Sequence, residues 1–322
     1  MAGGHARERT SLIVTVLEEA GTIDALLESV AAQTCPPDEV VVTDGGSTDG
    51  TLAALGTWSS RLPLRVIAAP GANIARGRNL AIESATGDLI AATDAGVRLA
   101  PDWLEQLHAR LTPEVDVVSG FFHPDAGSVF ERALGATTLP ALEDVKPDAF
   151  LPSSRSVLFR RAAWQHVGGY PEWLDYCEDL VFDLALRRAG CRFVFAASAI
   201  AWFRPRATPK AFFRQYFLYA RGDGKAGLWW RRHALRYATY AIAAVLVWRR
   251  SRAAWLLPLG VAVYTRRPYA RLRLDGLTPG QRLYALSLPP LIRLVGDVAK
   301  MLGYPVGVFW RKRRAWTSRS SS

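Results

Sequence analysis

The strongest constraint on the fold of this 322-residue chain is the alternation of short apolar, β-branched runs with helical patterns over its first 200 residues. Several runs are continuously apolar, as expected of parallel strands covered on both faces. We expect strands at Leu12–Val16, Glu39–Thr43, Leu64–Ala68, Leu89–Thr93, Val115–Ser119 and Arg192–Ala196. We expect helices at Thr22–Gln33, Thr51–Trp58, Asn73–Ala85, Pro101–Leu111 and Asp179–Ala189. This pattern predicts an α/β fold, with a doubly wound, mainly parallel sheet flanked by helices and a ligand site beyond the carboxyl ends of the strands.

Charge divides the chain into two different parts. Residues 1–200 contain 16 Lys and Arg against 26 Asp and Glu, whereas residues 201–322 contain 24 against 3, together with seven of the 11 Trp. A basic, aromatic-rich surface suits either an anionic membrane or a nucleic acid. The basic clusters flank long apolar runs and form no recognisable nucleic-acid module, which favours a membrane partner. We expect two domains, residues 1–228 and a basic, helical, membrane-associated region at 229–322.

The apolar runs of the second part are short for membrane spans. Tyr237–Trp248 and Ala253–Tyr264 are uncharged runs of 12 residues each, and Leu283–Trp310 contains charges and prolines that should break a helix. A full span needs about 20 residues. We therefore expect monotopic or short membrane-embedded helices that lie in or dip into the cytoplasmic leaflet, with Arg at anionic headgroups. Short true spans and a buried helical domain are the alternatives.

The cysteines and the N-terminus give two further expectations. Cys35, Cys177 and Cys191 form no C-x-x-C pair, which excludes a zinc ribbon and a disulfide framework and fits a reducing, intracellular compartment. Residues 1–10 contain no apolar core typical of a secretory signal peptide.

Polar residues that could bind a ligand or take part in catalysis follow the predicted strands. Asp44 and Asp94 each end an apolar run. The Asp44 carboxylate suits a base or ribose donor, and the Asp94 carboxylate can hold a hard cation or a ribose hydroxyl. Arg76 and Arg78 open the helix between them, and a guanidinium at a helix start suits diphosphate oxygens. The alternatives are an ordinary strand-to-helix turn after Asp44 and surface ion pairs for the arginines.

An ordered set of segments carries a family resemblance. The segments are Ile13–Glu19, Val41–Thr51, Gly77-Arg78-Asn79, Ala85-Thr86-Gly87-Asp88 ahead of Asp94, Phe159-Arg160-Arg161, Gly168-Gly169-Tyr170 and Glu178-Asp179. Over residues 10–225 the chain resembles the family 2 glycosyltransferases and their nucleotide-diphospho-sugar-binding GT-A domain. The resemblance implies an inverting, hexosyltransferase-like enzyme of cell-envelope polysaccharide or glycolipid synthesis. It would move a sugar from a nucleoside-diphosphate sugar to a hydroxyl acceptor. From the expected membrane attachment we further expect a lipid-linked or membrane-proximal acceptor at the cytoplasmic face of the cell membrane.

The resemblance also implies roles for individual residues. Asp179 would be the general base that takes the proton of the acceptor hydroxyl, with Glu178 as an orienting group or an alternative base. The other reading is that both are first-turn carboxylates favoured by the helix dipole. The matching positions imply nucleotide-sugar contacts for Thr15, Glu18, Asp44, Arg78 and Asp94, with Asp94 at the ribose or at a metal.

Two departures from the family pattern bear on the metal. Gly45 follows Asp44 where the family commonly has a second acid, and Gly96 replaces the second carboxylate of the Asp-x-Asp motif. Loss of an anionic ligand weakens a divalent site for Mg²⁺ or Mn²⁺. The chain would hold metal through Asp94 and the diphosphate, recruit a side chain such as His123, or depend little on metal. A non-catalytic nucleotide-sugar-binding or scaffold protein is the alternative function, and a nucleotidyltransferase is a third.

Two later segments are further candidates. Ala211–Lys225 reads as an aromatic-rich helix that runs into a Gly-punctuated basic loop, similar in placement to the Gln-x-x-Arg-Trp segment of related synthases. It predicts Arg221 or Lys225 as a diphosphate clamp, with a solvated amphipathic helix as the alternative. Pro152–Ser156, ahead of a predicted strand, would line the acceptor side or be a plain loop.

Overall fold

The computed structural model describes residues 8–320, and the side chains as far as residue 314. Most of the N-terminal stretch predicted to lack a signal-peptide core, residues 1–7, is therefore outside the described residues. The chain forms two compact units: the first runs to His123 and resumes at Leu142–Phe203, and the second comprises Pro124–Ala141 and the residues from Arg204 on. The domain boundary expected after residue 228 does not coincide with this division, because residues 204–228 pack with the C-terminal helices.

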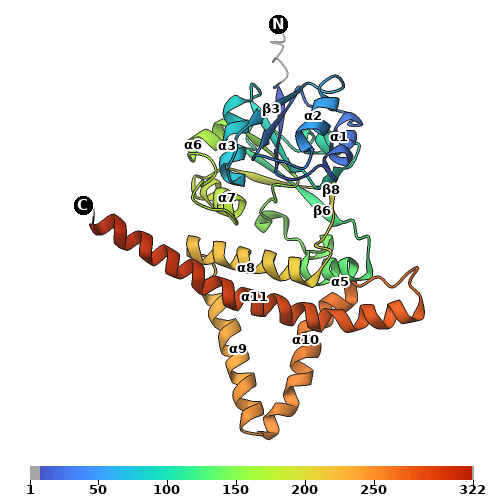
Figure 1. Cartoon of the computed structure of the whole chain (residues 1–322), viewed down its shortest axis with the longest axis vertical. Coiled ribbons are helices and arrows are strands. Elements are labelled where there is room, and N and C mark those ends of the chain that lie inside the picture. The colour runs from blue at the N-terminus through green and yellow to red at the C-terminus, as the bar shows by residue number, and fades with distance from the viewer. Residues whose placement is uncertain (1–7, 321–322) are drawn as a thin grey trace. The chain divides into compact units, whose positions relative to one another are not determined.

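The first unit is built on a mixed sheet of eight strands within the described residues (Figure 1). The strands are β1 (Thr10–Val16), β2 (Glu39–Asp44), β3 (Leu64–Ala68), β4 (Leu89–Asp94), β5 (Val97–Leu99), β6 (Val117–Pro124), β7 (Val157–Arg160) and β8 (Phe193–Phe203). Their order is β3-β2-β1-β4-β7-β6-β8-β5. The pairs β3–β2, β2–β1 and β1–β4 are parallel, whereas β4–β7, β7–β6 and β8–β5 are antiparallel. The predicted α/β class is confirmed, and its parallel part is the first four strands of this order.

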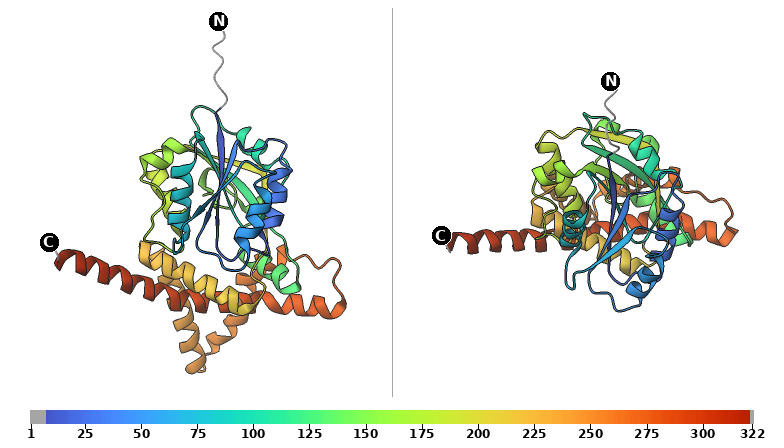
Figure 2. Two further views of the ribbon diagram at one scale, coloured as in Figure 1. Left: turned by 45° about the horizontal axis from the view of Figure 1, so that its top comes forward. Right: turned by 90° about the horizontal axis from the view of Figure 1, so that it is seen from above.

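Helices flank this sheet on both sides (Figure 2). They are α1 (Ile23–Ala31), α2 (Thr51–Trp58), α3 (Ile74–Ser84), α4 (Trp103–His108), α6 (Arg161–His166) and α7 (Glu178–Arg188). In α1, Ile23, Leu26, Leu27 and Val30 are buried at the spacing of one helix face. The predicted α2 and β3 have the observed bounds, and the short β5 and α6 had no prediction.

Strand register brings the polar strand ends to one edge. In the ladder between β1 and β4, Thr15 pairs with Asp94, and in the ladder between β1 and β2, Val16 pairs with Asp44. Parallel strands in this register end at the same level, so the side chains that follow them share one edge of the sheet.

The second unit is helical. Its main helices are α5 (Val129–Thr138), α8 (Pro209–Ala226), α9 (Trp230–Trp248), α10 (Leu256–Arg271) and α11 (Pro279–Ser320). A buried apolar cluster includes Phe130, Leu134, Phe212, Leu288 and Ile292, from α5, α8 and α11. Helices α9 and α10 form a hairpin that projects from α8 and α11 (Figure 1).

Two sequence expectations about these helices are wrong. The segment through Gly222 and Gly224 is not a loop but part of α8. Glycine is present there because α8 and α11 approach closely: a Cβ at Gly224 would lie 2.3 Å from the Tyr304 carbonyl oxygen. The breaks expected at Pro289-Pro290 and Pro305 are absent, since α11 continues through all three. Its packing on α8 and α5 offsets the hydrogen bonds that proline removes.

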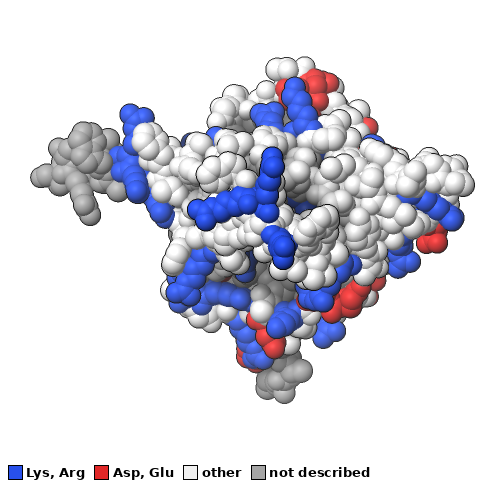
Figure 3. Space-filling model, turned by 90° about the horizontal axis from the view of Figure 1, so that it is seen from below, with Lys and Arg blue, Asp and Glu red and all other residues white. Residues whose placement is uncertain are grey.

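The hairpin of α9 and α10 exposes apolar side chains. Among the exposed large apolar residues are Leu235, Ile242, Val245, Val247, Trp248, Trp255, Leu256, Leu259, Val261 and Val263. The surface that includes the hairpin, seen from below, is mostly uncharged, with separate Lys and Arg side chains and few acids (Figure 3). Within residues 8–320 no helix has both the length and the apolar composition needed to cross a membrane.

Candidate active site

A buried guanidinium ties three elements of the first unit together. Arg78 lies on α3, and its side chain is 4% exposed. One terminal nitrogen donates to Glu178 Oε1 at 2.7 Å, and the other donates to Asp94 Oδ1 at 2.9 Å. Two carboxylates compensate the cost of burying this cation. The result is a fixed link between the end of β4, the body of α3 and the first turn of α7.

Glu178 is the more buried of the two acids that begin α7. Its side chain is 7% exposed. Burial, reinforced by the Asp179 carboxylate, raises the pKa of Glu178 to about 7, although Arg78 opposes the rise. The short ion pair with Arg78 favours the charged form of Glu178, whereas burial favours the neutral form. The effect of burial is the larger of the two. Glu178 therefore titrates near neutral pH while it holds Arg78.

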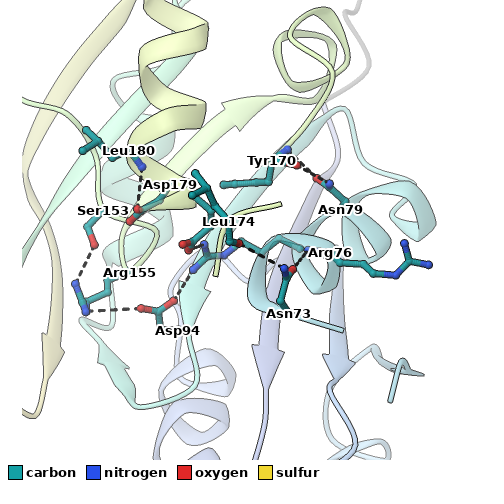
Figure 4. Close-up of polar contacts among 12 residues, drawn as sticks. Asn73, Arg76, Asn79, Asp94, Ser153, Arg155, Tyr170, Leu174, Asp179 and Leu180 are labelled. Carbon is teal, nitrogen blue, oxygen red and sulfur yellow. Dashed lines mark hydrogen bonds and ion pairs between the residues drawn. The ribbon is translucent and has the colours of Figure 1, made fainter. Parts of the chain in front are cut away.

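Asp179 is adjacent and half-buried, with Oδ1 accepting a hydrogen bond from its neighbour Leu180 at 2.8 Å (Figure 4). The residue just before the pair, Cys177, has a φ of 65°, a left-handed conformation that is uncommon for a side-chain-bearing residue. Such backbone strain concentrates at functional sites. Of the two acids, Asp179 is the one whose carboxylate is partly open to a ligand.

Asp94 stands at the tip of β4 with its side chain 30% exposed. Its second oxygen, Oδ2, lies 3.6 Å from Nε of Arg155, and Ser153 accepts a hydrogen bond from the Arg155 side chain (Figure 4). The Arg155 guanidinium also packs 4.4 Å from the ring centroid of Phe203. Pro152–Ser156 was expected either to line the acceptor side or to be a plain loop. The guanidinium of Arg155, within this segment, lies at the end of β4.

The residues around Asp94 do not form a metal site by themselves. Both oxygens of Asp94 already face guanidinium groups, and Gly96 supplies no second carboxylate. In the described part of the chain no group of three His, Cys, Asp or Glu side chains is arranged to hold a metal. His123, the suggested replacement ligand, lies in β6 and packs edge-on against Phe121 at 5.0 Å, and burial lowers its pKa.

Hydrogen bonds join the loops that follow β1 and β2. Glu18 Oε1 accepts hydrogen bonds from the Thr48 amide at 2.8 Å and from its hydroxyl at 3.0 Å, while the Glu18 amide donates to Ser47 Oγ. Asp44 is buried, and its carboxylate accepts from the amides of Gly46 and Ser47. These contacts preorganise the loops at the strand ends, where Thr15 also lies.

The two arginines that begin α3 do not converge. Arg76 extends away from Asp94 and pairs with the exposed Glu172 at 3.2 Å (Figure 4). Asn73 caps the helix by accepting from the Arg76 amide. The expectation of two guanidinium groups at one site is therefore wrong for Arg76, because residues two apart on a helix project from nearly opposite sides.

Arg221 and Lys225 belong to α8 in the second unit. The Lys225 ammonium lies 4.8 Å from the ring centroid of Trp310. Their role as a diphosphate clamp stays a prediction.

Sequence reasoning assigned no role to two groups near the acid pair, Asp183 and Tyr170. Asp183, one helical turn after Asp179, is buried, with no hydrogen-bond partner for Oδ2 among the described residues; burial raises the pKa of its carboxyl well above the ordinary value. Tyr170 stacks on Phe182 at 4.1 Å, and its ring faces the Arg78 guanidinium at 5.4 Å. The four-residue spacing from Asp179 was the available signal for Asp183.

Comparison with known proteins agrees with this geometry. Residues 11–166 match the family model "Glycosyl transferase family 2". The chain is 29% identical over 241 residues to the succinoglycan biosynthesis protein ExoA of Rhizobium meliloti (strain 1021), covering 70% of this chain and 72% of the relative. It is 26% identical over 228 residues to glycosyltransferase AglE of Haloferax volcanii, covering 68% and 73%.

Two solved structures share the fold. One is the mannosyltransferase PcManGT from Pyrobaculum calidifontis in complex with GDP-Man and Mn²⁺, with a TM-score of 0.64, 21% identity, and coverage of 92% of this chain and 88% of that chain. The other is S. aureus TarS 1-349 in complex with UDP-GlcNAc, with a TM-score of 0.53, 19% identity, and coverage of 94% and 92%. The fold and the family match define a glycosyltransferase of the GT-A type. The chain is a glycosyltransferase whose residues 11–166 match the family 2 glycosyltransferases.

Proposed function

We propose that this enzyme transfers a sugar, with inversion, from a nucleoside-diphosphate sugar to an acceptor hydroxyl, with Asp179 as the general base. The observation that carries the proposal is the link from Arg78 to Glu178 and Asp94, which fixes the start of α7 against the end of β4. A base must be held within hydrogen-bond reach of the hydroxyl that it deprotonates. Glu178 and Arg78 are then positioning residues for the partly open Asp179.

In the proposed step, the acceptor oxygen attacks the anomeric carbon from the face opposite the diphosphate. A carbon–oxygen bond forms to the acceptor while the bond to the diphosphate oxygen breaks, and the nucleoside diphosphate leaves with that electron pair. The hydroxyl proton goes to Asp179. Thr15, Glu18, Asp44 and Asp94, at the carboxyl ends of the parallel strands, are proposed to hold the nucleotide-sugar. Arg221 and Lys225 are proposed to neutralise the leaving diphosphate.

The donor class is supported by the relatives in fold, which were solved with GDP-Man and with UDP-GlcNAc. Mn²⁺ accompanies GDP-Man in one of them. In this chain Asp94 would offer Mg²⁺ or Mn²⁺ one carboxylate that two guanidinium groups already engage. We therefore expect less dependence on a protein-held metal than an Asp-x-Asp site would give.

We also propose that the acceptor is lipid-linked or membrane-proximal and that the enzyme works on the cytoplasmic face of the cell membrane. The support is the hairpin of α9 and α10, whose apolar side chains are exposed around the helices. Residues 237–248 and 253–264 of the hairpin contain no charged side chain, and an exposed apolar surface of this kind belongs in a core or in lipid. Residues 230–274 contain no Asp or Glu, while Trp248 and Trp255 stand at the turn, 79% and 83% exposed. This combination suits an anionic membrane interface.

The test is release of nucleoside diphosphate by the detergent-purified chain, across UDP-, GDP- and dTDP-sugars, with membrane lipid extract as acceptor source and with Mg²⁺, Mn²⁺ or EDTA. We expect one donor to support release, and Asp179→Asn to lower turnover by about a thousandfold or more while donor binding persists. Asp88→Asn, at an exposed carboxylate of the same unit, is the matched control and should turn over like the wild type. Full turnover by Asp179→Asn would overturn the assignment of the base.

A further inference from the structure

One face of α11 carries three charged residues. Arg293, Asp297 and Lys300 are spaced by four and three residues, which places them on the same side of a helix. Arg293 and Lys300 are about 10 Å apart along the axis, a gap that their long side chains can close toward one group between them. The face lies where α9 and α10 meet α11, because Asp297 contacts side chains from both of these helices.

Asp297 is already fully engaged. Its Oδ1 accepts from Nε of Arg236 at 2.7 Å, and its Oδ2 accepts from the hydroxyls of Tyr240 at 3.1 Å and Tyr264 at 2.9 Å. The carboxylate is buried, so its charge is matched by Arg236 on α9. The direct ion pair of Asp297 is with Arg236, whereas its attraction of Lys300 on α11 acts without a direct ion pair.

Arg293 and Lys300 make no ion pair among the described residues. Nε of Arg293 is buried with no hydrogen-bond partner within this set, and its guanidinium lies 4.6 Å from the ring centroid of Tyr264. The Lys300 ammonium lies 4.8 Å from the ring centroid of Tyr216. Burial, followed by the repulsion of Arg236, lowers the pKa of Lys300 to about 8, although Asp297 and Asp223 oppose the decrease. Around Lys300 the cations, with Arg236 and Arg293, outnumber the carboxylates Asp297 and Asp223, and a further anion would lower the cost of burying this excess charge.

The chemistry of the anion follows from its surroundings. A guanidinium and an ammonium together suit phosphate oxygens, which accept several charge-assisted hydrogen bonds. The Arg293 guanidinium packs on Tyr264 of α10, and Asp297, between the two cations, contacts both helices of the hairpin, so a phosphate that arrives with a lipid would reach them at the headgroup level. We propose that Arg293 and Lys300 bind a phosphate or diphosphate group carried by a membrane lipid. This inference rests on the membrane attachment proposed above.

The test is flotation of the full chain with phosphatidylcholine vesicles that contain either phosphatidic acid or phosphatidylglycerol, at matched surface charge. Phosphatidic acid presents an accessible phosphate, so we expect the wild type to prefer it by about tenfold. Arg293→Gln/Lys300→Gln should abolish the preference, and Arg293→Lys/Lys300→Arg should retain it. Arg249→Gln/Arg250→Gln, at the hairpin turn, is the matched charge control and should weaken binding to both vesicles equally.

The outcomes of the flotation experiment distinguish failure of the phosphate site from failure of the membrane attachment. Equal flotation of the wild type with both lipids would overturn the phosphate site while leaving membrane attachment intact. No flotation with any vesicle would overturn the attachment itself and, with it, this inference. Competition by inorganic phosphate as effective as that by farnesyl diphosphate would assign the site to free phosphate and overturn the lipid source. Removal of two cations from a region where cations outnumber carboxylates should not lower the thermal midpoint, so we expect the double variant to fold, and circular dichroism checks this.

Discussion

At the residue scale, the site depends on the protonation of one buried acid. Glu178 forms its ion pair with Arg78 only as a carboxylate, yet its pKa is raised from the ordinary 4.5 to about 7 by burial and by Asp179. A raised carboxyl pKa means that the fold favours the neutral form. Its contribution to stability is therefore present below pH 4.5 and is lost as the pH rises through about 7. Activity should follow the opposite trend.

We therefore predict that sugar transfer decreases as the pH falls below about 7, because protonated Glu178 releases the Arg78 ion pair. Glu178→Gln, permanently neutral, should lack this acid limb and should show lower activity on the plateau. The measurement is initial rate against pH for both proteins, beside the free energy of unfolding at each pH. Identical acid limbs in the two proteins would assign the titration to another group.

A second residue-scale prediction concerns the metal. A Cβ at Gly96 would meet nothing within 4 Å, and the backbone there is not left-handed, so a side chain fits. Gly96→Asp should add a carboxylate near Asp94 and tighten Mn²⁺ binding by about tenfold in the presence of nucleoside diphosphate. Calorimetric titration of Mn²⁺ measures this, with Gly96→Ala as the control. Unchanged affinity would show that the added acid does not reach the ion.

The residues of the site were predictable where a motif fixes them, and less so where packing does. Arg78, Asp94 and Glu178 were all named as candidates and lie together, but the ion pairs between them were not predicted and their roles remain predictions. Arg76 was expected at the same site as Arg78 because both guanidinium groups suit a diphosphate. Only one of two helical residues spaced by two can face the sheet. Arg155 reaches Asp94 from a loop 61 residues further along the chain, and no local pattern encodes a contact of that kind.

At the element scale, the hairpin of α9 and α10 is the part of the molecule that most needs a partner. Val245 and Val261 are 46% and 50% exposed, so a charge at either position leaves the core unchanged. We predict that Val245→Glu/Val261→Glu lowers vesicle flotation by about tenfold or more, because burying carboxylates in lipid is costly. Leu52→Glu, at a leucine 45% exposed in α2, is the matched control and should float like the wild type. Equal flotation of all three would place membrane contact elsewhere.

The packing of α8 on α11 gives a second prediction at this scale. Gly224→Ala should destabilise the chain by about 2 kcal/mol, since the new Cβ would meet the Tyr304 carbonyl 2.3 Å away. Gly56→Ala in α2, where nothing lies within 4 Å, should be neutral or stabilising. Thermal unfolding of both variants measures the difference. A stable Gly224→Ala protein would mean that the two helices separate without cost.

Element prediction succeeded where the signal is local. The bounds of α2 and β3 follow from composition and periodicity alone, and both match the structure. Gly222-x-Gly224 was interpreted as loop because glycine usually breaks helices, but here a neighbouring helix requires the small residue. The prolines of α11 were interpreted as breaks for the same kind of reason. In both cases a contact distant in sequence outweighs the intrinsic preference of the segment.

At the scale of the whole molecule, the two units do not follow the order of the chain. The second unit takes α5 from the middle of the sequence and α8 from before the expected boundary. A chain that ends at residue 228 would keep α8 but lose α11, and would uncover Phe212 and the apolar cluster around it. We predict that such a truncated chain aggregates or unfolds at a lower temperature than the full chain. Size-exclusion chromatography and thermal unfolding measure this, and a monomeric truncated chain of full thermal stability would contradict it.

The link made by Arg78 also has a consequence for synthesis. Its two carboxylate partners lie 16 and 100 residues further along the chain, so the longer contact closes a large loop of polypeptide. Long-range contacts of this kind form late, after loop closure has been compensated by packing. A chain growing on the ribosome therefore offers Arg78 only Asp94 of its two carboxylate partners until α7 has emerged, and donor binding by a nascent or refolding chain reports that the first unit is complete.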